Sequence, residues 1–435
     1  MNAPVTLIRT PAENAYVQAF EAARGTLTDN AAVTALREAA FAVFAATGLP
    51  HRRIEAWHYT DLRNLQREVL PTAEAHVSGA DAVRVDMLSG GLEATRIVLI
   101  NGQFVPDLSA KTFPKGVRVR ALHEVLSSAT AADVEALGGY GLAGDDSVFA
   151  LNTALMQGGV VIDVEAGAEI AVPLHILSLN ADASASTTRS LVRVGAGAKL
   201  TLIESHAGGA QKNDALILDI RDKANFAHIV RVSREASLDL ASVVARIGAD
   251  VAFDSFALVS GGKLVRRQLF VRLNGENTKV ALGGVSLLKD KQHADTTLSV
   301  EHVAPHCESR EKYKHIVADD AVGVFQGKIC VAADAQKTDG KMMSNAVLLS
   351  ETAVMNNKPE LEIFADDVVC GHGATVGALD EDQIFYCQAR GLPKPVAEAL
   401  LLEAFAVEAL DGITNESVRE LLHGDISTWL KGRSA

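Results

Sequence analysis

The chain has 435 residues, a net charge of -13 and 48% hydrophobic residues. This composition excludes a disordered chain, and the acidic excess argues against nucleic-acid partners or an anionic membrane surface. The four cysteines include no CxxC pair, which excludes a disulfide framework and favours a reducing compartment. No stretch approaches the roughly 18 apolar residues of a membrane span. We therefore expect a cytoplasmic protein without membrane or nucleic-acid partners.

The first part of the chain has the periodicity of α-helices. Pro11 suits the first turn of a helix, and the apolar residues of 30–47 follow helical spacing. The aromatic residues Trp57 and Tyr59 come next, and we expect them to be core or anchoring residues. The pattern predicts an N-terminal helical region over residues 1–90.

From about residue 95, short runs of Val, Ile and Leu alternate with Gly, Asn and Asp. Segments 164–172 (VEAGAEIAV) and 194–202 (VGAGAKLTL) share Val-x-Ala-Gly-Ala followed by alternating aliphatic residues. Small residues at a corner and inward aliphatic side chains suit a coil of stacked strands. We predict a β-helix core over residues 91–388. The alternative is a long antiparallel sandwich in which these two segments match by chance.

The end of the chain returns to helical periodicity. Residues 394–410 carry a broad apolar stripe, and a second amphipathic helix follows Gly412. We predict a C-terminal helical region over residues 389–435 that either caps the last coil or offers a docking surface. The candidate docking residues are Leu401, Phe405, Leu422 and Trp429.

The most informative segment, Lys358–Gly377, reads KPELEIFADDVVCGHGATVG. It places Cys370 and His372 two residues apart, so both side chains point to the same face of an extended strand. Thiol and imidazole are soft or borderline metal ligands, but two ligands do not make a structural zinc site, which needs four. We expect any metal here to take further ligands from elsewhere in the fold or from another chain. A buried thiol beside a hydrogen-bonded imidazole is the alternative.

A second cluster of possible ligands contains His302, His306 and Cys307. Pro305 interrupts it, and the charged residues that follow are typical of a solvated segment. We interpret this cluster as structural or interfacial before interpreting it as a metal site.

Segment 323–329 superficially resembles a phosphate-binding loop. It has three residues between its glycines where the motif needs four, and Ile329 stands where a Ser or Thr would hold Mg²⁺. We therefore expect that this chain binds no ATP.

Three segments together resemble the SufB/SufD family of the SUF system, which assembles iron–sulfur clusters. They are 309–350, from SREKYKH onward, 358–392, which contains CGHGATVG, and WHYTDL at 57–62, which is similar to the SufD branch. The resemblance implies a mostly β fold, in which a right-handed parallel β-helix is flanked by N-terminal and C-terminal α-helical regions.

The resemblance also implies a function. It implies a non-catalytic scaffold subunit that pairs with a SufB-type paralogue, while a SufC-type ABC ATPase docks on the C-terminal helices. A transient iron–sulfur cluster would form at the interface of the pair. His372 matches the family position proposed as a cluster ligand or assembly residue, and Cys370 matches the family cysteine. Cluster type, iron source, flavin involvement and the choice between heterodimer and homodimer stay open.

Two competing functions remain at this point. One is a β-helix enzyme acting on polysaccharide, with Asp366, Asp367 or Glu360 as acid and base. Only 5% of the residues are aromatic, whereas sugar-binding clefts usually offer stacking rings. The other is a purely structural partner, in which Cys370 and His372 can both be replaced without consequence.

Overall fold

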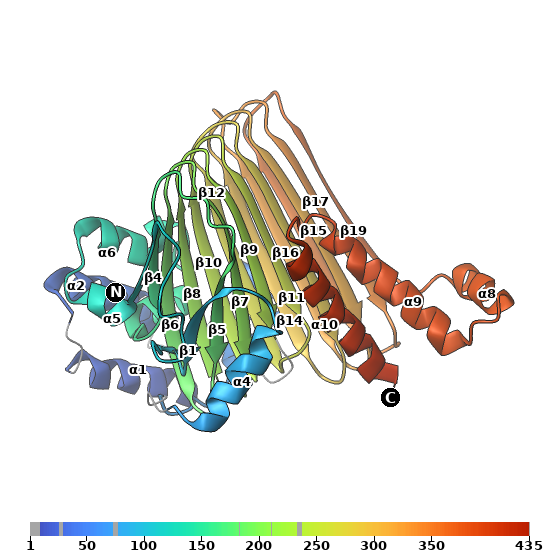
Figure 1. Ribbon diagram of the computed structural model, residues 1–435, viewed down its shortest axis with the longest axis horizontal. Helices are drawn as coiled ribbons and strands as arrows, with labels where there is room; N and C mark the ends of the chain where they lie inside the picture. Colours follow the sequence, from blue (N-terminus) through green and yellow to red (C-terminus); the bar gives the residue numbers. More distant parts are fainter. Residues whose placement is uncertain are drawn as a thin grey trace, which may run out of the picture.

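The centre of the molecule is a parallel β-helix built from two facing sheets (Figure 1). From β4 onward, consecutive strands alternate between the two sheets, so each coil adds one strand to each. The mostly β fold with a parallel β-helix core and flanking helical regions is thereby confirmed. The computed structural model describes residues 9–25, 29–72, 77–181, 183–209, 211–232 and 237–434.

All strand pairs are parallel except β1 with β2 and β3 with β4, at the N-terminal end. In spatial order, the ten-stranded sheet contains β2 (Gln103–Phe104), β1 (Thr95–Ile100), β5 (Leu174–Leu179), β7 (Lys199–Ala207), β9 (Asn225–Val232), β11 (Ala252–Val259), β13 (Lys279–Leu288), β15 (Glu308–Val317), β17 (Asp339–Leu348) and β19 (Val369–Gly377). The nine-stranded sheet contains β3 (Val117–Ala121), β4 (Val160–Val164), β6 (Ala185–Val194), β8 (Gln211–Ile220), β10 (Leu238–Ile247), β12 (Leu264–Leu273), β14 (His293–His302), β16 (Val322–Val331) and β18 (Val354–Ile363).

The repeated segments of the sequence lie one coil apart. Val164 pairs with Val194, and the N–H of Ile170 donates to the carbonyl of Lys199 at 2.8 Å. The two copies therefore make the same corner in successive coils, which confirms that their likeness marks a structural repeat.

Stacked corners also contain residues in the left-handed conformation. Asp250, Asn277 and His306 have φ of 56°, 60° and 59° at the same corner of three successive coils. The N–H of Asp250 donates to the carbonyl of Glu276 in the next coil, at 2.8 Å. Asp, Asn and His tolerate this conformation better than most residues do, so they suit these turns.

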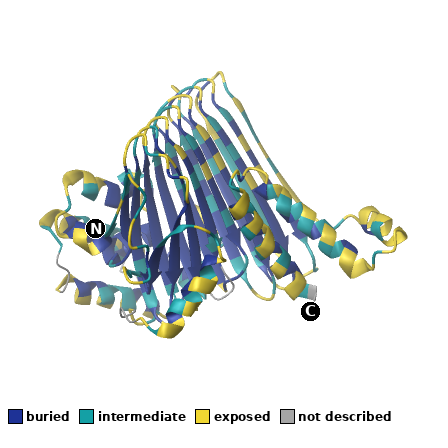
Figure 2. Cartoon of the chain, in the orientation of Figure 1, coloured by how far each residue is buried: buried dark blue, intermediate teal, exposed yellow. Residues whose placement is uncertain are grey.

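The interior between the sheets is mainly apolar, because alternate side chains of every strand point inward. Phe226 and Phe253, on neighbouring strands, are fully buried and stack with ring centroids 5.6 Å apart. Figure 2 shows the strands of the middle coils as mostly buried, whereas β18, β19, the loops and the helix surfaces are intermediate or exposed over much of their length. This continuous interior connects the coils along the axis of the β-helix.

The N-terminal helices cover the outer face of the nine-stranded sheet. A capping box between Thr10 and Glu13 starts the first of them, with Pro11 in its first turn. These elements are α1 (Pro11–Arg24), α2 (Ala31–Thr47), η1 (Glu55–Trp57), α3 (Leu62–Leu65), α5 (Leu122–Leu126), α6 (Ala131–Leu137), η2 (Gly139–Gly141) and α7 (Ser147–Leu155). The remaining one, α4 (Gly79–Ser89), packs on the ten-stranded sheet.

Helices α5, α6 and α7 interrupt the segment that the sequence predicted to be β-helix core. They are short, and every residue of α7 is buried. A short, continuous apolar run does not distinguish a buried helix from a buried strand, so the pattern did not predict them. The regular coils therefore begin at β4 rather than near residue 91.

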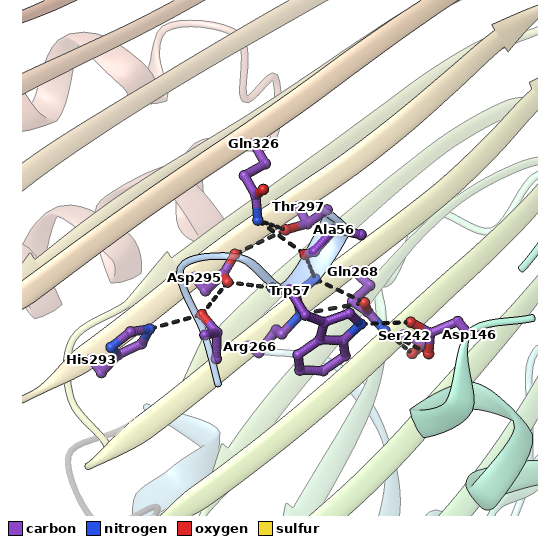
Figure 3. A network of polar contacts seen from close by, with 11 residues as sticks. Ala56, Trp57, Asp146, Ser242, Arg266, Gln268, His293, Asp295, Thr297 and Gln326 are labelled. Atoms are coloured by element: carbon purple, nitrogen blue, oxygen red, sulfur yellow. Dashed lines mark hydrogen bonds and ion pairs between the residues drawn. The ribbon is translucent and has the colours of Figure 1, made fainter. Parts of the chain in front are cut away.

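A polar network anchors the N-terminal region to the β-helix (Figure 3). Trp57 is 2% exposed and donates its indole N–H to Asp146 at 3.0 Å. The guanidinium of Arg266 lies 3.7 Å from the Trp57 ring and forms a buried ion pair with Asp295. The core or anchoring role predicted for Trp57 is confirmed, while Tyr59 is half-buried.

The C-terminal helices α9 (Lys394–Val407) and α10 (Glu416–Ser434), joined by η3 (Glu408–Leu410), pack on the outer face of the ten-stranded sheet. Helix α8 (Glu381–Ala389) precedes them and stands away from the β-helix (Figure 1). In the described part of the chain, no helix combines the length and the hydropathy needed to cross a membrane.

Candidate metal site at the end of the β-helix

The last coil of the β-helix is open. Within the described residues, β18 pairs only with β16 and β19 only with β17, so each strand keeps one unpaired edge. An unpaired edge presents backbone donors and acceptors to another chain. Apolar side chains are also exposed on this coil, namely Val354, Ile363, Phe364, Val369 and Val376. This coil is therefore the part of the β-helix that a partner chain can extend.

Cys370 and His372 both lie on the inner face of β19. Cys370 pairs with Gly340 and packs on the apolar interior, and His372 pairs with Met342, which is 2% exposed in that interior. No further coil covers them, so Cys370 is half-buried and His372 is exposed. The predicted sharing of one strand face is thus present, and it places both side chains at the open end.

The electrostatics of this end favour the neutral thiol. Burial raises the pKa of Cys370, and the carboxyl groups of Asp339 and Glu311 raise it further, while a backbone hydrogen bond at Gly340 lowers it. Only the thiolate binds a metal tightly, so a metal must displace this proton. The thiol is therefore kept in its less reactive, protonated form.

The glycines on both sides of His372 leave the strand without side chains at these two positions. A Cβ at Gly373 would lie 2.7 Å from the Cε atom of Met343, whereas one at Gly371 would meet nothing within 4 Å. Another part of this chain thus approaches Gly373 closely, whereas Gly371 borders open space.

The described residues supply no complete metal site. None of them form a group of three or more His, Cys, Asp or Glu side chains able to hold a metal ion. Cys370 and His372 therefore provide two donors suited to iron or zinc, and the remaining ligands of a cluster would have to come from outside the described chain.

The cluster predicted to be structural is dispersed. His302 is buried inside the β-helix and bonds the Ser309 hydroxyl at 3.0 Å, whereas His306 lies exposed at a corner. The thiol of Cys307 donates to the carbonyl of Gly275 at 3.3 Å. The three side chains serve different parts of the fold, in agreement with the structural interpretation.

The acidic residues of the polysaccharide alternative are also apart. Glu360 lies on β18 and forms an ion pair with Lys358 at 3.3 Å. Asp366 and Asp367 are exposed in the turn before β19, where Asp367 pairs with Lys337. The ion pairs of Glu360 and Asp367 therefore tie these carboxylates to local lysines.

The four candidate docking residues of the C-terminal region do not share one exposed surface. Leu422 is 0% and Trp429 1% exposed, because both pack between the helices and the outer face of the ten-stranded sheet. Leu401 is half-buried, and Phe405 packs at the edge of the same cluster. The prediction of Leu422 and Trp429 as docking residues was wrong, since the sheet itself uses that apolar stripe.

A different apolar surface is exposed on α8 and the start of α9. Phe385 is 71% and Tyr386 58% exposed, and Val396 and Leu400 are each 50% exposed. We call these four residues the α8–α9 surface. Sequence reasoning missed it because α8 lay at the expected boundary of the core.

Sequence reasoning also missed a chain of polar side chains inside the β-helix. In the sequence, the only indication of these side chains is that polar residues stand at inward positions of otherwise apolar strands. Five contacts link them from the ten-stranded to the nine-stranded sheet. In order of contact, these side chains are Ser255, His228, Glu204, His206, Asp214 and Thr188. The His228 ring nitrogen and the Glu204 carboxylate oxygen are 2.6 Å apart. The carboxylates of Asp214 and Glu204 outweigh burial and raise the pKa of His206 to about 9.

Comparisons with known proteins match most of this chain to one family. Residues 176–405 match the model of the SUF system FeS cluster assembly SufBD core domain, and residues 10–176 match the SufBD protein N-terminal region. The iron–sulfur cluster assembly protein SufD of Escherichia coli is 31% identical over 402 residues, which are 89% of this chain and 90% of that protein. An iron–sulfur cluster assembly SufBD family protein of Synechocystis is 31% identical over 423 residues, 92% of each chain.

A β-helix with these matches defines a class of protein devoted to iron–sulfur cluster assembly. The chain belongs to the SufB/SufD family of the SUF system. This membership confirms the resemblance and leaves the polysaccharide-acting alternative without support.

Proposed function

We propose that this chain is a scaffold subunit of an iron–sulfur cluster assembly complex and is not itself an enzyme. In the proposal it pairs with a SufB-type paralogue, and a nascent cluster forms between the two chains. The cluster is the cargo of the complex and passes on to acceptor proteins. Membership of the family supports the assembly role, and the geometry of the last coil supports the division of labour between the chains.

One observation carries the proposal: an incomplete pair of metal ligands lies on an unpaired strand edge. His372 and Cys370 point toward the open end of the interior, on a strand whose other edge has no neighbour among the described residues. A partner that continues the sheets would bring its own side chains to the same end. It would complete the ligand count and cover the exposed Phe364 and Val369 in one step.

The residues of this chain have distinct tasks in the proposal. His372 donates a ring nitrogen to iron, and its exposure lets a partner reach the other side of the metal. Cys370 supplies a thiolate once its proton leaves, and burial keeps it protonated before that. The apolar interior, with Met342 as its last inner residue beneath His372, limits the access of water from within the β-helix.

A separate ATPase would supply energy to this complex. The only segment resembling a phosphate loop, 323–329, lies within β16 (Val322–Val331) and pairs with β14 and β18 as an ordinary strand. We propose that a SufC-type ATPase docks on the α8–α9 surface, where Phe385 and Tyr386 are exposed and α8 stands clear of the sheets. Large aromatic side chains at such exposed positions are frequent anchors of protein interfaces.

The test is anaerobic isolation of this chain from its host, with and without the substitution His372→Ala. We expect a SufB-type paralogue and an ABC-type ATPase to co-purify with both versions, because His372 contributes little to the buried core. We expect iron and acid-labile sulfide only with the unaltered chain. Equal cluster content in both versions would support a purely structural partner and contradict the proposal.

A further inference from the structure

Glu311 is a buried acid directly beneath the open end of the β-helix. It lies on the inner face of β15 and is 1% exposed. Its strand position pairs with Met342 on β17, and Met342 pairs with His372 on β19. Because neighbouring strands lie about 4.8 Å apart, the backbones at Glu311 and His372 are roughly 10 Å apart, with Met342 between them.

The Glu311 carboxyl group has no fixed partner. Among the described residues, neither of its oxygen atoms has a partner in hydrogen-bond geometry, although the Ser309 hydroxyl lies near enough to lower the pKa of Glu311 against the larger effect of burial. Ser309, two residues earlier on the same strand face, bonds His302. Burial raises the pKa of Glu311 to about 8, so the neutral acid predominates at pH 7. A solitary charge here would be costly, and a protonated carboxyl avoids that cost.

The other titratable groups that face this part of the interior do not neutralise Glu311. Burial lowers the pKa of His315 on the same strand to about 3 and that of His302 on β14 to about 4, so both are neutral. Burial raises the pKa of Tyr313. The register neighbours of Glu311 on β13 and β17 are Leu282 and Met342, and Cys370 and His372 face inward from β19. Two cations act on this group. Arg310 lowers the pKa of Glu311 but is itself paired with Asp339, and Arg267 on β12 acts on Tyr313.

A charge on Glu311 nevertheless affects the ionisation of groups at the open end. The Glu311 carboxylate contributes to raising the pKa of Cys370. Electrostatic coupling is reciprocal, so a positive charge held at the open end makes ionisation of Glu311 easier. The low dielectric of the interior preserves this coupling over a distance that water would screen.

We propose that Glu311 is a charge-compensating residue, which keeps its proton while the open end is empty and releases it when a metal cation is held there. The step breaks the O–H bond of the carboxyl group, leaves a carboxylate and delivers the proton to solvent, and no electron moves. Glu311 does not touch the metal. It acts on the metal electrostatically, through the negative charge that its carboxylate gains. The inference rests on the proposed function, because it requires metal binding at His372 and Cys370.

The test is a titration of the purified complex of this chain and its paralogue with Fe²⁺ under argon. Protons released are counted with a pH indicator in weak buffer, and the carboxylic-acid infrared band is followed in the same samples. We expect Glu311→Gln to bind Fe²⁺ while releasing about one proton fewer per metal ion than the unaltered complex. The loss of a carboxylic-acid band on metal binding should be absent from this variant.

Two further variants complete the test. Glu311→Met removes the proton without adding a buried amide, and should give the same deficit. Glu308→Gln, on the same strand but paired with Lys279 at its outer side, is the matched control and should behave like the unaltered chain. Fe²⁺ binding with an unchanged proton count in both Glu311 variants would overturn this inference alone. No Fe²⁺ binding by the unaltered complex would overturn the proposed function and the inference together.

Discussion

The first and last coils of the β-helix are built in opposite ways. At the N-terminal end the two sheets stop at β2 and β3, two short strands that run antiparallel to their neighbours. At the C-terminal end the sheets stop at β18 and β19, which are full-length strands in register with the coil before them. The first end therefore stops at short strands that break the parallel pattern, whereas the last end stops at full-length strands that continue it.

The difference shows where this fold accepts a partner. Helices also cover the outer face of the nine-stranded sheet near the first end, and Trp57 and Arg266 fasten part of that cover. The last coil instead exposes apolar side chains, unpaired backbone and two candidate metal ligands together. Natural sheets usually blunt their edges with charged residues or proline, as β18 does with Lys358 and Pro359. The edge of β19 has neither, and such an edge beside two candidate metal ligands is best explained by a partner chain.

Removing the Trp57 anchor of the N-terminal helices should have the largest effect on stability. We expect Trp57→Ala to lower the free energy of unfolding by about 3–5 kcal/mol, because it leaves a cavity and removes the stacking partner of Arg266. Urea denaturation measures the change. His58→Ala, at the exposed neighbouring residue, is the control and should cost little. A loss below about 1 kcal/mol for Trp57→Ala would mean that the network is not an anchor.

Charging the open edge should affect binding and leave the fold intact. We expect the double substitution Phe364→Lys and Val369→Lys to weaken binding of the paralogue about hundredfold, since it places charges on an edge that must be buried. Titration calorimetry measures the affinity, and urea denaturation should show unchanged stability. Met87→Lys on α4, at a side chain that is 76% exposed, is the matched control. Undiminished binding would place the interface elsewhere.

Between the two ends, the buried His206 makes a pH-dependent contribution to the free energy of unfolding. The folded-state pKa of His206 is about 9, above the unfolded value of about 6.5. Its stabilisation is therefore fully present below pH 6.5 and is lost as pH rises through 9. We expect a loss on the order of 2 kcal/mol between pH 7 and about 9.5. In His206→Gln the urea midpoint should lose this part of its pH dependence, and an unchanged profile would contradict the assignment.

The α8–α9 surface should give the smallest effect. We expect Phe385→Ala with Tyr386→Ala to weaken ATPase docking about tenfold, while binding of the paralogue at the open edge stays the same. Pull-down with graded ATPase concentrations measures the difference. Leu422→Ala is not a suitable probe, because Leu422 is fully buried and its loss would act through stability. Equal docking with and without the two aromatic residues would exclude this surface.

The sequence predicted those features that depend on local periodicity. The repeat at 164–172 and 194–202 marked stacked coils, and the Cys-x-His spacing placed Cys370 and His372 on one strand face. The contacts of Leu422 and Trp429 could not be predicted, since an amphipathic stripe looks the same whether a sheet or a partner covers it.

The burial of Glu311 was equally inaccessible. Its neighbours in the sequence are charged, and only the pairing of β15 with β17 places it in line with His372. Features set by strand register between distant segments need the fold itself, because the spacing along the chain does not determine which coils lie together.

The central claim is that His372 is one half of a metal site shared with a partner chain. The most direct measurement is pulsed EPR on the reduced, cluster-loaded complex, in which only this chain carries ¹⁵N-labelled histidine. The account predicts a ¹⁵N coupling to the cluster in the unaltered complex, and no cluster signal at all in His372→Ala. A fully loaded cluster without such a coupling in the unaltered complex would contradict it.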